Sequence, residues 1–150
     1  MRGLVAFGLV LGAALTLAAP GAPAQQGLGA SLVTAMNGAR MRAGVATVHS
    51  SPSLRAAAAA HNREMVTFGY FGHQSRAGGL LQRMPRSYRR VGEILFEGAG
   101  TVEARTVVAA WLASPEHRAI LLGSAWRDVG VSAAAHGREL LVTVDFGSHT

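Results

Sequence analysis

A chain of 150 residues has room for one ordinary domain with a real core, and its 49% hydrophobic content excludes a largely disordered protein. It has no cysteine, which excludes disulfides and thiolate metal sites. The formal net charge is +6, but the arginines that carry it are spread along the chain, so we expect no nucleic-acid partner.

Residues 1–24 have the pattern of a secretory signal peptide. Arg2 provides the positive start, an apolar stretch runs from Leu4 to Ala19, and the segment ends on a small-x-small cleavage pattern. Cleavage there leaves residues 25–150 as the mature domain of a secreted or periplasmic protein. The apolar stretch is shorter than the ~18–20 residues that a membrane span needs, although an uncleaved anchor stays open.

Two helices are expected next. The first covers about residues 31–43, and we interpret Asn37 inside it as a side chain that bonds local backbone. The second covers about residues 52–68 and begins at the Ser51-Pro52 cap. His61 falls on its apolar stripe, where we favour a core histidine with one satisfied nitrogen over a ligand.

The loop over residues 69–75 holds a better functional candidate. His73 follows two aromatic residues there, and loop residues on a rigid scaffold are over-represented in sites. A short helix near residues 79–84 is expected after it. The arginines that follow are interpreted as a solvated loop, and the alternative is a patch for anionic cell-surface polymers or lipids. They are Arg83, Arg86, Arg89 and Arg90.

Glu93 lies inside an apolar run from Val91 to Phe96, so we expect it to be at least partly buried. A buried carboxylate needs a partner, because an isolated buried charge is costly. The ordinary partner is an arginine, and the sharper alternative is a histidine pair or a metal.

A helix capped by Thr101 is expected to end near Ser114-Pro115, where a second short helix begins. His117 then falls in the first turn of the second helix. The positive end of the helix dipole favours a neutral imidazole, which can bind a metal or accept a proton.

The last segment predicts a β-hairpin over residues 129–146, because apolar residues alternate on both sides of a turn at His136-Gly137. We also expect Asp145 to pair with Arg118, which would tie the hairpin to the helix that carries His117.

Together these motifs resemble the CAP superfamily, also called the SCP-like or cysteine-rich secretory, antigen 5 and pathogenesis-related 1 domain, in its short cysteine-free bacterial form. The resemblance covers about residues 30–147. It implies an α+β fold, a three-layer α-β-α sandwich with a mostly antiparallel central sheet. The motifs that carry it are, in order, Tyr70-Phe71-Gly72-His73, Val91-Gly92-Glu93-Ile94, Trp111 to Arg118, Val129-Gly130-Val131 and Asp145-Phe146-Gly147.

The resemblance also implies a cleft that gathers His73, Glu93 and His117. Some family members bind a divalent metal, usually zinc, through the two histidines, which are His73 and His117 in this chain. Ser114 falls near the second glutamate of eukaryotic members and is not a carboxylate. The asparagine that usually follows the family's Gly-Glu pair is Ile94 here, which removes a polar neighbour from the cleft.

Two functions follow from the resemblance. The first is an extracellular, monomeric binding module for a cell-envelope lipid, polysaccharide or protein, with a cleft able to hold a divalent metal. The alternative is a metal-dependent hydrolase acting on peptide or cell-wall material, with Glu93 as the catalytic base. Neither an HExxH zinc signature nor a Ser-His-Asp order is present, and whether the chain is an enzyme stays open.

Overall fold

The computed structural model describes residues 22–150, and the side chains of residues 27–150. Most of the predicted signal peptide lies outside the described residues, and its last three residues, 22–24, begin the first helix. None of the described helices has the length and apolar character that crossing a membrane requires. The elements are α1 Ala22–Arg42, β1 His49–Ser50, α2 Pro52–Phe68, α3 Leu80–Arg83, β2 Arg90–Ala99, α4 Ala104–Ala113, α5 Pro115–Leu121, β3 Asp128–His136 and β4 Glu139–Ser148.

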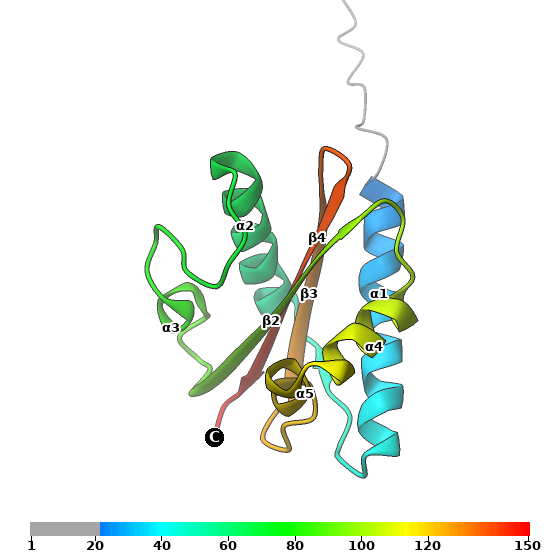
Figure 1. The fold of residues 1–150 in the computed structure, drawn as a ribbon. Helices are drawn as coiled ribbons and strands as arrows, with labels where there is room; N and C mark the ends of the chain where they lie inside the picture. Colours follow the sequence, from blue (N-terminus) through cyan, green and yellow to red (C-terminus); the bar gives the residue numbers. More distant parts are fainter. Residues whose placement is uncertain (1–21) are drawn as a thin grey trace, which may run out of the picture.

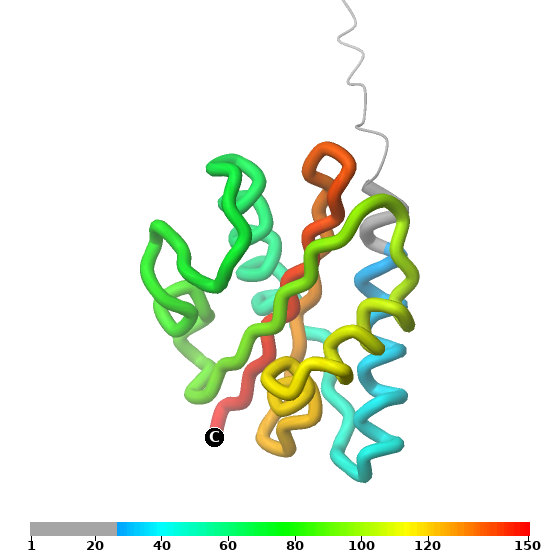
Figure 2. Tube along the Cα trace, in the orientation of Figure 1, coloured from blue at the N-terminus to red at the C-terminus, as the bar shows by residue number. Residues whose placement is uncertain are grey.

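The four strands form one mixed sheet in the order β1-β3-β4-β2. β1 is parallel to β3, whereas β3–β4 and β2–β4 are antiparallel, so the sheet is mostly antiparallel as predicted. Helices α1, α4 and α5 cover one face, and α2 and α3 cover the other (Figure 1). The trace in Figure 2 shows β2 running alongside the C-terminal strand, which lies between β2 and β3. The predicted three-layer α-β-α sandwich is confirmed.

Local sequence signals explain several boundaries. The Ser51 hydroxyl accepts a hydrogen bond from the Leu54 N–H, and Gly69 ends α2 in the left-handed conformation, with φ of 65°. The hairpin also matches its prediction, because Gly137 supplies the positive φ of the turn between β3 and β4. Short helix α3 falls inside its predicted range.

Two local predictions were wrong. Thr101 is not the cap of α4, which begins at Ala104 after Glu103, and the Glu103 side chain makes no capping hydrogen bond. Asn37 does not bond local backbone. Its amide donates to the Val48 carbonyl and accepts from the Val48 N–H, each at 2.9 Å, and so holds the segment that leads into β1.

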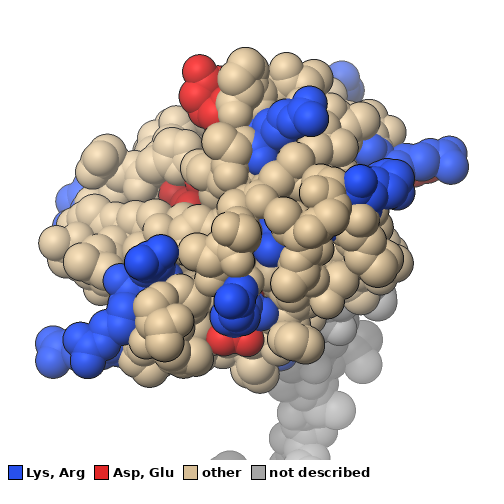
Figure 3. Space-filling model, turned by 90° about the horizontal axis from the view of Figure 1, so that it is seen from below, with Lys and Arg blue, Asp and Glu red and all other residues tan. Residues whose placement is uncertain are grey.

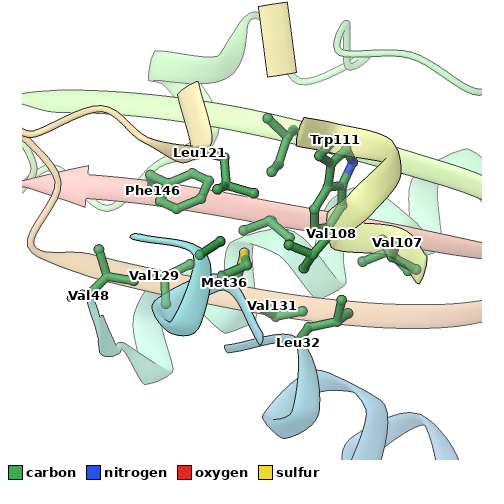
Figure 4. Packing of buried hydrophobic residues seen from close by; sticks show 14 of the residues in the cluster. Leu32, Met36, Val48, Val107, Val108, Trp111, Leu121, Val129, Val131 and Phe146 are labelled. Carbon is green, nitrogen blue, oxygen red and sulfur yellow. The ribbon is translucent and has the colours of Figure 1, made fainter. Parts of the chain in front are cut away.

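The main core lies between the sheet and the helices α1, α4 and α5 (Figure 4). Even-numbered residues of β2 and β4, such as Ile94 and Phe146, point into it. Odd-numbered residues point to the opposite face, toward α2, where Thr143 donates a hydrogen bond to the side chain of Asn62. The strand alternation therefore places Glu93 on the α2 face.

Candidate functional site

Glu93 is the centre of a polar cluster on the α2 face of the sheet. It is only 3% exposed, and each of its carboxylate oxygens accepts a charge-assisted hydrogen bond. Oε1 accepts from Nδ1 of His73 at 2.8 Å, and Oε2 accepts from Nη2 of Arg83 at 2.6 Å. The predicted buried carboxylate is thus present, and it has both an arginine and a histidine as partners.

His73 extends from the buried carboxylate of Glu93 to the protein surface. Its side chain is 54% exposed, although its Nδ1 is fixed by a carboxylate that is nearly inaccessible. Because Nδ1 is engaged, Nε2 is the ring nitrogen left to meet a ligand. The loop that carries His73 is held from α2, where Glu64 accepts hydrogen bonds from the Ser75 hydroxyl and the Arg76 N–H.

His61 also contacts the loop that carries His73. Its Nε2 donates to the Gly72 carbonyl at 2.9 Å, so Nδ1 carries no proton in the neutral ring. Burial, and then the nearby Arg83 charge, lower the pKa of His61, which keeps the imidazole neutral at pH 7. The prediction of a core histidine with one satisfied nitrogen is confirmed.

Asp145 is the cross-strand neighbour of Glu93 and is fully buried. Neither of its oxygens makes a hydrogen bond within the described part of the chain. Burial, and then the Glu93 charge, raise its pKa to about 9, so the carboxyl is neutral at pH 7. The predicted pair with Arg118 is wrong, because α5 packs on the opposite face of the sheet and Arg118 is exposed there.

The buried side-chain nitrogen and oxygen atoms that lack a hydrogen-bond partner all belong to this cluster, within residues 27–150. They come from four residues that surround Glu93, namely His61, Tyr70, Arg83 and Asp145. Native proteins leave few such atoms unpaired, and ordered water or a ligand commonly satisfies them. The cluster therefore has unused donors and acceptors in addition to the exposed edge of His73.

His117 and Ser114 form a separate pair. Nδ1 of His117 donates to the Ser114 hydroxyl at 2.8 Å, and that hydroxyl donates to Glu116 at 3.2 Å. Ser114 precedes α5 as predicted, but its side chain does not cap the helix backbone. In the described part of the chain, no hydrogen bond or ion pair joins His117 to His73 or Glu93. The structure thus shows direct contact between two of the three predicted cleft residues, and the place of His117 in the cleft stays a prediction.

The arrangement does not form a metal site with three protein ligands. Across the described residues, no three histidine, aspartate or glutamate side chains are grouped so that they could hold a metal ion. Glu93 is already engaged at both oxygens. Binding of a divalent metal such as zinc by His73 and His117 stays a prediction.

Two members of the cluster, Arg83 and Asp145, differ from what the sequence predicts. The sequence predicts a solvated loop for Arg83, yet its side chain is only 6% exposed, whereas Arg86, Arg89 and Arg90 are exposed as expected. The sequence signal for the burial of Arg83 was its position at the end of a short helix before β2. Asp145 alternates with apolar residues of β4, which indicates burial on one face of the sheet. Figure 3 shows basic side chains at several separate places on one side of the molecule.

One family model matches most of the chain. The family model described as the cysteine-rich secretory protein family, CAP, matches residues 33–146. The chain is 29% identical over 110 residues to the uncharacterized protein YkwD of Bacillus subtilis, covering 71% of this chain and 42% of that protein. The chain therefore spans less than half the length of this curated relative.

Solved structures share the fold. An outer surface protein from Borrelia burgdorferi has a TM-score of 0.72 at 21% identity, covering 79% of this chain and 90% of that one. An extracellular SCP-domain protein from Bacillus anthracis has a TM-score of 0.71 at 22% identity, covering 82% of this chain and 41% of that one.

Proposed function

The chain belongs to the CAP family of cysteine-rich secretory proteins, and from this premise we propose that it is an exported binding module that holds a cell-envelope ligand against His73. Two kinds of observation support export. Residues 1–24 have the pattern of a signal peptide. Two proteins of the same fold are described as an outer surface protein and an extracellular protein.

The observation that carries the proposal is the anchoring of an exposed imidazole on a buried carboxylate. Glu93 holds Nδ1 of His73, and Arg83 holds Glu93 and reaches the His73 carbonyl at 3.4 Å. A side chain that is fixed before binding loses little conformational entropy when a ligand arrives. Nε2 of His73 thus offers a preorganised contact for a polar group of a lipid, polysaccharide or protein.

The hydrolase alternative is less favoured by the same geometry. A general base must come within hydrogen-bond reach of the proton that it removes. Both oxygens of Glu93 are occupied by cationic or polar N–H donors, and the residue is almost inaccessible. Glu93 is therefore better suited to positioning His73 than to activating water, so a binding role follows more directly.

The experiment compares binding to purified lipid, polysaccharide and protein fractions of the cell envelope. We expect wild type to bind one class of fraction and His73→Ala to bind it at least about tenfold more weakly, which corresponds to ~1.4 kcal/mol. His136→Ala, at the turn of the hairpin, is the matched control and should bind like wild type.

Turnover is measured on the same samples. The binding proposal expects no hydrolysis of peptide or peptidoglycan by any variant. Turnover by wild type that disappears in Glu93→Gln would contradict it and support the hydrolase. Equal binding by His73→Ala and wild type would also contradict it, because the ligand would then not contact the imidazole.

A further inference from the structure

A groove lies at the far edge of the sheet from β2, where α1 and α2 stand on either side of β3. Its volume is about 800 Å³. Small side chains form its two walls, which are Gly29 and Ala30 on α1 and Ala56 and Ala59 on α2. Because β4 separates β3 from β2, this groove is distinct from the cluster around Glu93.

The floor of the groove is a strand edge that the described part of the chain leaves without a partner strand. β1 pairs with β3 only at Asp128 and Val129, and the Val129 carbonyl accepts from the Ser51 N–H at 2.8 Å. β1 ends there because Pro52 begins α2. The next residues whose backbone groups point away from β4 are Val131 and Ala133, by the alternation of an antiparallel ladder.

Gly29 of α1 lies beside this edge and presents no side chain to it. A Cβ atom at Gly29 would lie 3.8 Å from the Val131 carbonyl oxygen, so a larger side chain there would project over the strand edge. The other wall is also short, because Ala56 and Ala59 extend only a methyl group from α2. A strand that entered the groove would point its side chains alternately toward α1 and α2, and both walls leave room for them.

The charge of the groove indicates the kind of strand that fits. Arg55 is the one charged residue among those that line it, and Arg55 is exposed. We infer that the groove binds an extended, acidic peptide segment of another protein, which pairs with Val131 and Ala133 as an added strand of the sheet. Main-chain hydrogen bonds would give affinity, and Arg55 would favour a carboxylate in the peptide.

The test uses the exported protein and a fluorescent seven-residue peptide of alternating valine and threonine with one central glutamate. We expect saturable binding by fluorescence anisotropy, and slower hydrogen exchange at the amides of Val131 and Ala133 in the complex. Methylation of alternate peptide nitrogens should abolish binding for one set of positions and not for the other, because only one set faces β3.

Variants locate the contact. Gly29→Leu should weaken binding at least about tenfold by filling the groove. Gly27→Leu is the matched control, since a Cβ atom there meets nothing within 4 Å, and should bind like wild type. Arg55→Glu should weaken binding of the glutamate peptide and restore it when the peptide carries lysine instead.

Three outcomes would overturn the inference. One is equal binding by the peptides methylated at either set of positions. Another is a dimer of the protein alone that Gly29→Leu dissociates, because the occupant would then be a second copy. The third is loss of peptide binding in His73→Ala, which would place the peptide at the other site. Normal peptide binding by His73→Ala keeps this inference independent of the proposed function.

Discussion

The two faces of the sheet are built from the same strands, but the α2 face combines apolar clusters with buried carboxylates. Toward α1, α4 and α5 the strands present apolar side chains, such as Ile94, Val144 and Phe146. On the α2 face the residues next to these in sequence include Glu93 and Asp145, which are equally buried but polar. Because successive side chains of a strand point to opposite faces, neighbouring residues contribute alternately to the main core and to the site.

Each face depends on a different physical property. The apolar face depends mainly on volume, because the hydrocarbon side chains of its strands require close packing. The polar face depends on pairing, because Glu93 and Arg83 are buried charges that compensate each other. Substitutions at adjacent positions should therefore fail in different ways, and this can be measured.

The largest effect is expected from Phe146→Ala on the apolar face. Phe146 is fully buried and stacks against Trp126 with ring centroids 5.9 Å apart. Its truncation should lower the free energy of unfolding by about 4 kcal/mol through lost burial and a new cavity. Urea denaturation followed by circular dichroism measures this. A loss below about 1 kcal/mol would show that this face is not the main core.

Removing a charge from the polar face should cost somewhat less. Arg83→Ala leaves Glu93 buried without its cation, so we expect a loss of about 3 kcal/mol in unfolding free energy. Arg86→Ala is the matched control, because Arg86 is exposed three residues away, and it should leave stability nearly unchanged. Equal losses in the two variants would contradict the buried pair.

Asp145→Asn should change the pH dependence of stability. The pKa of Asp145 is raised from 3.8 to about 9 in the folded protein, so between these values the folded state binds more protons than the unfolded state. The stabilisation is present below pH 4 and is lost progressively as the pH rises toward 9. Asparagine cannot ionise, so denaturation midpoints of the variant should fall less between pH 5 and 8. Parallel profiles for variant and wild type would show that Asp145 is ionised in the fold.

Sequence patterns predicted the helices and strands better than they predicted which of them lie side by side in the fold. The Ser51-Pro52 start and the Gly69 end of α2 were readable because capping is local chemistry. The burial of Glu93 was readable from its apolar neighbours in the chain. In contrast, β1 has only two residues and exists because β3 lies beside it, so no local pattern could indicate it.

The site was predicted only in part, because several of its features depend on contacts between distant elements. The contact between His73 and Glu93 followed from the family resemblance. The burial of Arg83 depends on where α3 packs, and the neutral Asp145 depends on the register between β2 and β4. Register and face are tertiary properties, which a chain without its partner strands does not display.

The smallest expected effect is the coupling between the stability changes of His73→Ala and His117→Ala. It tests most directly whether the two faces of the sheet are separate. His73 is bonded to Glu93 on the α2 face, whereas His117 is bonded to Ser114 beside α5. We expect the stability changes of His73→Ala and His117→Ala to add in the double variant within about 0.5 kcal/mol, since the two side chains share no partner. Thermal unfolding with and without zinc measures this. A stabilisation by zinc that either single substitution abolishes would show instead that the two imidazoles meet around the edge of β2, and would establish the metal site that the family resemblance implies.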